Sequence, residues 1–272
     1  MTTKKALRSA LATFLFLALG SSAAIAQEHK EVYNEALAAA GAKQYTVAYD
    51  KYEKAAELAK AAGDDEVRNS SLKVLAQLDK IFGSRDFKKG NYEAALTYFN
   101  KGISHNPAYM PNYYNKGLAL KKLDRIDDAM AALKLAADGT DRKVAREADE
   151  SIRSHFHAEA SGLLAKANLS ASDADRALGQ LAEMEKYVEP DADSYFYMAT
   201  AYSAKGDYTQ AISMADEALK IHKGGRSDKA KIHFLKGEAL MYAGDAAAAK
   251  AEFANAQYGS YAQSAKHYIE NL

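Results

Sequence analysis

The sequence predicts an all-α protein, built from about six helix-turn-helix units and closed by a C-terminal helix. Its 272 residues are rich in alanine and include only three prolines, and alanine is the best helix former while proline is the worst. A pattern of turn, small residue and bulky residue returns along the chain at fixed spacing, as it does in repeat proteins. Within residues 259–272, Tyr261, Ala265, Tyr268 and Ile269 share one face, which predicts an amphipathic capping helix.

The first 26 residues have the order of parts of a secretory signal peptide. Lys4, Lys5 and Arg8 give a basic start, Ala10–Leu19 is apolar, and small residues precede a cleavage site after Ala26. The apolar run is about ten residues long, whereas about 20 are needed to span a bilayer, so an uncleaved membrane anchor is the weaker alternative. We therefore expect export, to the periplasm rather than out of the cell, and a mature chain of residues 27–272.

The composition of the mature chain excludes several kinds of site. The whole chain has 36 basic and 36 acidic residues, and loss of the three leader cations leaves a net charge of −3. This balance lacks the concentrated basic footprint of a nucleic-acid-binding protein. There is no cysteine, which excludes a thiol nucleophile, a zinc–thiolate site and an iron–sulfur cluster. No later segment is apolar for long enough to cross a membrane.

One unit of the repeat is clearest at residues 90–102, where a Gly-Asn-Tyr turn precedes a helix with small and aromatic residues at steps of three and four. Similar turns begin at Gly206 and Gly244. Aligned on these turns, each unit has a small residue in its first helix: Ala36, Gly83, Gly117, Ala165, Ala199 and Gly237. Twelve residues later, the second helix has Ala48, Ala95, Ala129, Ala177, Ala211 and Ala249. Four residues beyond these stand Tyr52, Phe99, Leu133, Leu181, Ala215 and Phe253.

This spacing has a steric reason, because two antiparallel helices approach closely only where a side chain is nearly absent. The pattern resembles the tetratricopeptide repeat (TPR) family, whose helix-turn-helix unit has 34 residues. The resemblance covers about residues 29–257, although Lys43 and Ser172 stand where the pattern has a turn glycine. It implies a right-handed α-α superhelix with units near 29–62, 76–109, 110–140, 158–190, 192–224 and 230–258, capped by 259–272.

Two intervals between units are longer than 34 residues. The first unit lies 47 residues from the second, and the third lies 48 from the fourth. Each excess of 13 or 14 residues is close to four helical turns, so it can lengthen a helix without rotating its apolar face. We therefore predict long helices near Asp65–Phe87 and Asp141–Leu169. A separate extra helix in each interval is an equally weighted alternative.

No group of residues predicts catalysis, a metal ion or a cofactor. His155 and His157 are two residues apart, so on a helix they point in directions about 200° apart and cannot share a metal. The pairs Asp64-Asp65 and Asp127-Asp128 stand at expected helix starts, where the helix dipole accounts for them. The chain has no phosphate-binding loop, no His-Glu-x-x-His motif and no nucleophile elbow. We expect a protein that is not an enzyme.

In the TPR family, the first helices of successive units line a concave groove. The resemblance implies that the groove here is lined by Tyr33, Leu37, Lys80, Ser84, Tyr114, Leu118, Lys121, Lys166, Phe196, Thr200, Phe234 and Met241. Aromatic residues with Lys between them would suit a partner segment with apolar anchors and some acidic character. Alternatively, Tyr114, Phe196 and Phe234 pack between neighbouring helices. Some members grip a C-terminal carboxylate with Lys, Asn and Arg, but only Lys80 has a full counterpart here.

The leading interpretation is an exported scaffold that binds one or more cell-envelope proteins in this groove. Stacked repeats favour it, because they build an extended surface rather than a closed pocket. The main alternative is binding of a glycan or small molecule on the aromatic groove, and a hydrolytic enzyme with scattered residues ranks third. Self-association through exposed helix faces is also possible. The sequence names no partner.

Overall fold

The computed structural model describes residues 27–272, in which the chain is helical and forms no strand. This confirms the predicted all-α class. The predicted signal peptide, residues 1–26, lies outside the described residues. Contacts divide the chain into two compact units, the first ending at Ala145 and the second running from Arg146 to Leu272. Between residues 27 and 272, no helix is both long and apolar enough to cross a membrane.

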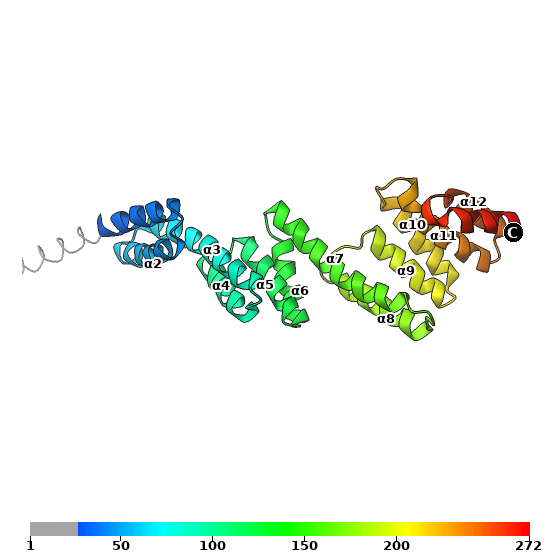
Figure 1. Cartoon of the computed structure of the whole chain (residues 1–272), viewed down its shortest axis with the longest axis horizontal. Coiled ribbons are helices and arrows are strands. Elements are labelled where there is room, and N and C mark those ends of the chain that lie inside the picture. The colour runs from blue at the N-terminus through cyan, green and yellow to red at the C-terminus, as the bar shows by residue number, and fades with distance from the viewer. Residues whose placement is uncertain (1–26) are drawn as a thin grey trace, which may run out of the picture. The chain divides into compact units, whose positions relative to one another are not determined.

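The first unit is a series of antiparallel helices, each in contact with the next (Figure 1). A helix at 27–41 precedes five others. These are α2 (Tyr45–Ala62), α3 (Asp65–Lys88), α4 (Tyr92–His105), α5 (Met110–Lys122) and α6 (Ile126–Ala137). The first helices of two successive pairs, α3 and α5, also contact each other. This is the contact that brings neighbouring first helices onto one face of the unit.

The second unit repeats the same arrangement. Its helices are α8 (Ala171–Met184), α9 (Ala192–Ala204), α10 (Tyr208–Ile221), α11 (Arg226–Tyr242), α12 (Ala246–Asn255) and α13 (Ala262–Asn271), with a short 3-10 turn, η1 (Gly259–Tyr261), before α13. The first helices α9 and α11 contact each other as α3 and α5 do. Ala265 of α13 is fully buried against Phe253 and its neighbours, which confirms the predicted amphipathic capping helix.

Both long intervals are occupied by long continuous helices. The 24 residues of α3 fill the first, as predicted. The second holds α7 (Arg142–Leu164), whose 23 residues carry the predicted stripe of Val144, Ala148, Ile152 and Phe156, all buried. The alternative of a separate extra helix is wrong in both places. However, α7 ends at Leu164 instead of continuing to Leu169.

Small residues allow the paired helices to approach closely, as the repeat pattern predicts. A Cβ atom placed on Gly83 of α3 would lie 2.5 Å from Phe99 Cε1 of α4. The same substitution at Gly237 of α11 would bring a Cβ atom within 2.8 Å of Phe253 Cε1 of α12. Both phenylalanines are fully buried. The bulky residue of the second helix therefore occupies the space left by the missing side chain of the first.

Five helix pairs share one turn geometry. The residue five positions before the second-helix alanine has a positive φ in each of them: Lys43 (59°), Gly90 (85°), Asp124 (58°), Gly206 (77°) and Gly244 (91°). The left-handed conformation suits glycine, and it is strained for a residue with a Cβ atom. Lys43 therefore keeps the turn of the repeat although it lacks the residue that the turn favours.

The fourth pair corrects the sequence alignment. Ala165, assigned as its small contact residue, is exposed and lies beyond the end of α7, and Ser172 lies inside α8 rather than at a turn. The fully buried small residue of α7 is Ala160, which packs against Ala177 and Leu181 of α8. The loop between these helices is longer than in the other pairs, because α8 begins only after its own N-cap at Ser170. The spacing of twelve residues therefore fails in this pair.

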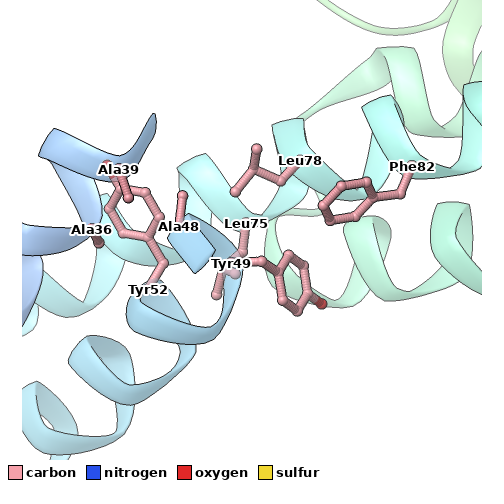
Figure 2. Close-up of a cluster of buried hydrophobic side chains, with 8 residues drawn as sticks. All are labelled: Ala36, Ala39, Ala48, Tyr49, Tyr52, Leu75, Leu78 and Phe82. Atoms are coloured by element: carbon pink, nitrogen blue, oxygen red, sulfur yellow. The ribbon is translucent and has the colours of Figure 1, made fainter. Parts of the chain in front are cut away.

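The core of the first unit joins three helices (Figure 2). Tyr52 of α2 is fully buried beside Ala36 and Ala39 of the first helix. Leu75 and Phe82 of α3 complete the cluster from the other side. Burial of each large apolar side chain contributes about 1.5–3 kcal/mol, so α3 is held in place by α2 and the first helix as well as by its contact with α4.

Candidate partner-binding surface

The residues of the predicted groove are all at least partly exposed, and they divide between the two units. In the first unit, Tyr33 and Leu37 lie on the helix at 27–41, Lys80 and Ser84 on α3, and Tyr114, Leu118 and Lys121 on α5. In the second unit, Phe196 and Thr200 lie on α9, and Phe234 and Met241 on α11. Lys166 is on neither set of first helices.

A concave surface lies along the second half of α3. It is an open depression of about 550 Å³, lined by Lys80, Ile81, Ser84, Arg85, Lys88 and Lys89. Four of these six residues are cations, and Ile81 is an exposed apolar side chain among them. Two residues of the predicted groove, Lys80 and Ser84, are therefore part of a hollow with a marked positive charge.

The other predicted groove residues of the first unit include an exposed apolar side chain and a half-buried lysine. Leu37 is 54% exposed on the helix at 27–41. On α5, burial lowers the pKa of Lys121, and the charge of Lys122 beside it lowers it further. A lysine whose charged form is disfavoured in this way would gain from a nearby carboxylate.

The aromatic groove residues of the second unit are already engaged. The Nζ atom of Lys231 lies 4.8 Å from the centre of the Phe196 ring and 2.6 Å from Asp193 Oδ1. Phe234 packs against three rings at centroid distances of 5.2–5.8 Å, those of Phe253, Tyr261 and Tyr268. For Phe234, the alternative of packing between helices therefore describes the structure better than a role in an open groove.

Lys166 is held in the loop before α8. Its Nζ atom pairs with Asp173 Oδ1 at 2.5 Å, and Asp173 also accepts a hydrogen bond from the Ser170 hydroxyl at 2.7 Å. The hydrogen bonds from Lys166 and Ser170 lower the pKa of Asp173 to about 2. The assignment of Lys166 to a first helix depended on a longer α7, and it is wrong because the helix ends at Leu164.

Buried polar contacts between helices form a second set of notable residues, which the sequence analysis missed. Asp79 of α3 is fully buried, and its carboxylate accepts hydrogen bonds from the Tyr49 hydroxyl at 3.1 Å and His105 Nδ1 at 2.7 Å. Burial, followed by the charge of Asp79, raises the pKa of Tyr49. The available signal was an aspartate within the apolar stripe of Leu75 and Phe82.

A similar contact lies between α11 and α12. Glu252 accepts hydrogen bonds from His233 Nδ1 and Lys236 Nζ, both at 2.7 Å. Burial raises the pKa of Glu252, but these two hydrogen bonds outweigh it, so the pKa stands below its usual value. Carboxylate–histidine contacts between helices thus occur in both units, and they satisfy polar groups that packing has removed from water.

Ser194, His157 and Asp191 have the composition of a catalytic triad but not its geometry. The Ser194 hydroxyl lies 2.7 Å from His157 Nε2 and 2.9 Å from Asp191 Oδ1. In a triad the carboxylate contacts the other ring nitrogen of the histidine, whereas here Asp191 contacts the serine. Ser194 is fully buried, and its backbone N–H donates to Asp191 in the capping box of α9. These residues therefore form a helix cap.

Metal binding finds no support in the part of the chain that the structure describes. Residues 27–272 contain no group of three or more His, Asp or Glu side chains that could hold a metal ion. His155 and His157 have different neighbours. His157 contacts Ser194, and the His155 ring lies 5.1 Å from that of Phe156.

The family model described as "Tetratricopeptide repeat" matches residues 111–138 and 192–223. These stretches coincide with the pairs α5–α6 and α9–α10, one in each unit. These two helix pairs are identified as tetratricopeptide repeats. Among curated proteins, an uncharacterized protein of Methanocaldococcus jannaschii is 51% identical to this chain over 41 residues, which is 15% of the chain. The chain spans about half (48%) of that relative's length.

Several solved structures share low identity with this chain. A thermophilic TPR protein of Thermus thermophilus is 18% identical, with 72% of this chain and 97% of that chain covered and a TM-score of 0.32. MamA of Desulfovibrio magneticus is 16% identical, with coverage of 72% and 96% and a TM-score of 0.36. The TPR2AB domain of yeast Sti1, solved in complex with pHSP90, is 18% identical, with coverage of 90% and 98% and a TM-score of 0.35.

Proposed function

We propose that this TPR protein is an exported scaffold that binds a segment of a cell-envelope protein. The observation that carries the proposal is the surface of the first unit, where Leu37 is exposed on the helix at 27–41 and Ile81 is exposed within the concave, cation-lined stretch of α3. Exposed apolar side chains flanked by charge are typical of protein-binding surfaces. Stacked repeats offer such a surface as a continuous face. We infer no catalytic role, since the triad-like residues of the second unit form a helix cap.

The glycan alternative receives less support. It needs aromatic faces that are free to stack on a sugar, but Phe234 is surrounded by three rings and Phe196 carries Lys231 on its ring. The surface of the first unit instead combines aliphatic groups with cations. That combination suits a peptide better than a sugar ring, because it offers apolar contacts and charge pairing side by side.

A crosslinking pull-down of residues 27–272 from envelope extract of the source cells tests the proposal. A Leu37→Ser, Tyr114→Ala, Leu118→Ser variant removes the apolar side chains of the groove. A Val47→Ser, Leu135→Ser variant is the control, because it removes two exposed apolar side chains elsewhere in the same unit. The expected result is a partner that is captured by the wild type and the control but lost with the groove variant. Capture that is equal for all three would contradict the proposed surface.

Export is tested separately. The expected result is that protein recovered from the periplasmic fraction begins at Gln27, as shown by N-terminal sequencing. A chain that retains residues 1–26 and stays with the cytoplasmic fraction would contradict export. It would not affect the scaffold proposal, which the pull-down tests.

A further inference from the structure

The hollow on α3 contains four cations that have no acidic partner. Within residues 27–272, none of Lys80, Arg85, Lys88 and Lys89 forms an ion pair. Arg85 instead lies over the ring of Phe82, with 5.5 Å between its Cζ atom and the ring centre. Other lysines of the chain do have partners, such as Lys51 with Glu35 at 2.5 Å. The cations of this surface are therefore not paired with carboxylates in the part of the chain that the structure describes.

The acidic residues next to these cations along the chain form no ion pair with them. Asp79 is fully buried and faces Tyr49 and His105 on the other side of α3. Asp86 forms no ion pair in the part of the chain that the structure describes. Like charges one helical turn apart repel each other, and Arg85 and Lys89 stand in that relation. An anion in the hollow would relieve this repulsion.

The dimensions of the hollow indicate what kind of anion it takes. Lys80, Ser84 and Lys88 follow one line along the helix, and Ile81, Arg85 and Lys89 follow the line beside it. From Lys80 to Lys89 the helix rises about 13 Å, which is the length of about four residues of extended chain. A single phosphate group would contact only one end of such a row. The exposed Ile81 between the cations also offers an apolar contact that an inorganic ion cannot use.

We propose that the hollow formed by Lys80, Ile81, Ser84, Arg85, Lys88 and Lys89 binds an extended acidic peptide segment with an apolar residue between its carboxylates. This inference rests on the proposed scaffold function and names the chemistry of the partner. Carboxylates at the two ends of the segment pair with Lys80 at one end of the hollow and with the cluster of Arg85, Lys88 and Lys89 at the other. The Ser84 hydroxyl donates a hydrogen bond, and the apolar residue packs on Ile81. The net charge of −3 on the mature chain works against nucleic acids and anionic membranes.

Fluorescence anisotropy with two labelled peptides tests this directly. The probe is Gly-Asp-Glu-Leu-Glu-Asp-Gly, and its matched counterpart is Gly-Asn-Gln-Leu-Gln-Asn-Gly, which has the same shape without the charges. Residues 27–272 should bind the acidic probe and not the amide counterpart. Affinity should fall as salt is raised, because exposed charge pairs are screened. Equal affinity for both peptides, or no binding of the acidic one, would overturn the inference.

Charge-reversal variants locate the site. Lys80→Glu with Lys88→Glu should weaken binding of the acidic probe by about tenfold or more. Lys73→Glu with Lys101→Glu is the control, because it changes the net charge equally at two exposed residues outside the hollow. The control should bind almost as the wild type does. An equal loss of affinity in both variants would mean that the peptide is attracted by overall charge, and it would overturn the site. Displacement of the labelled probe by pyrophosphate at the same concentration as by unlabelled acidic peptide would also overturn it.

The outcome is separable from that of the proposed function. The pull-down could lose its partner with the Leu37, Tyr114, Leu118 variant while the acidic probe fails to bind. That result would support the scaffold function and contradict the acidic peptide as its ligand. Circular dichroism of each variant checks the fold, and Lys80→Arg with Lys88→Arg should keep binding because it keeps the charges.

Discussion

Gly237 is buried where α11 meets α12, and a methyl group there would lie 2.8 Å from Phe253 Cε1. Gly237→Ala should lower the free energy of unfolding by about 1–3 kcal/mol, because a fully buried ring must move to admit the methyl group. Gly179→Ala in α8 is the matched control, since no atom lies within 4 Å of its added Cβ. It should be stabilising by about 0.5–1 kcal/mol. Urea denaturation measures both, and a stable Gly237→Ala variant would contradict the close contact.

Lys43 has a φ of 59° at the first turn, where three other turns have glycine. Lys43→Gly should raise the free energy of unfolding by about 0.5–1 kcal/mol, because glycine adopts this conformation without strain. The comparison is Lys89→Gly, one residue before the turn glycine of the second pair, where φ is −84° and glycine gains nothing. Equal effects of the two substitutions in urea denaturation would show that the turn at Lys43 is not strained.

His157 couples the stability of the second unit to pH. Burial lowers its pKa, as do the charges of Arg153 and Lys231, against the opposite effect of Asp191 and Asp193. The unfolded chain therefore takes up a proton first, and stability should fall as pH drops from about 7 through the unfolded pKa of about 6.5. His157→Gln should flatten this decline when denaturation is measured between pH 7.5 and 5.

The control for this prediction is His267→Gln on the exposed face of α13, which should leave the pH dependence as it is. The nearby carboxylate Asp191 acts in another range. Burial raises the pKa of Asp191, but hydrogen bonds from Ser194 and the nearby cations lower it by a larger amount. Its contribution to stability is therefore lost only below about pH 4. A decline between pH 7 and 5 that persists in His157→Gln would assign the effect to other groups.

Residues whose role depends on local spacing could be predicted from the sequence. Gly83 and Gly237 followed from the repeat, because a missing side chain recurs where helices must touch. Asp79 could not be predicted, since its partners Tyr49 and His105 are 30 and 26 residues away and no pattern links them. The exposure of the groove residues of the second unit could not be predicted for a different reason. Exposure of Phe234 depends on Tyr261 and Tyr268 of the capping segment, which the repeat does not contain.

At the scale of an element, α8 begins with a capping box. The Ser170 hydroxyl accepts a hydrogen bond from the Asp173 backbone N–H at 3.1 Å, and the Asp173 carboxylate accepts one from the Ser170 hydroxyl. Ser170→Ala should lower the free energy of unfolding by about 0.5–2 kcal/mol, the usual cost of losing an N-cap. Ser172→Ala, two residues into the helix and exposed, should change it little. Similar losses for both substitutions would mean that the cap does not define this helix start.

This capping box also explains the one pair that was misaligned. The spacing of twelve residues between contact residues assumes a short turn, and it holds where the turn has a residue with positive φ, as at Gly90. Between α7 and α8 the Ser170-x-x-Asp173 signal was present in the sequence and marks a later helix start. Giving the cap more weight than the repeat would have moved Ala165 and Lys166 out of the first helix.

At the scale of the whole molecule, the division into two compact units predicts that unfolding has two steps. Gly83→Ala should move the transition of residues 27–145, and Gly237→Ala that of residues 146–272, each with little effect on the other. Urea unfolding followed by hydrogen exchange with mass spectrometry assigns each step to its residues. A single transition that both substitutions shift would contradict two separately cooperative units.

The length of α3 has a consequence for how this chain can change. It packs against both α2 and α4, so one continuous helix fixes the rotation of one helix pair relative to the next. Each inserted or deleted residue turns the far half by about 100° and shifts it by about 1.5 Å. Gains or losses of three, four or seven residues keep Leu75 and Phe82 facing their neighbours, whereas those of two or five turn them toward water. Only insertions and deletions of certain lengths in this helix are therefore tolerated, because the packing of the core limits them independently of any binding partner.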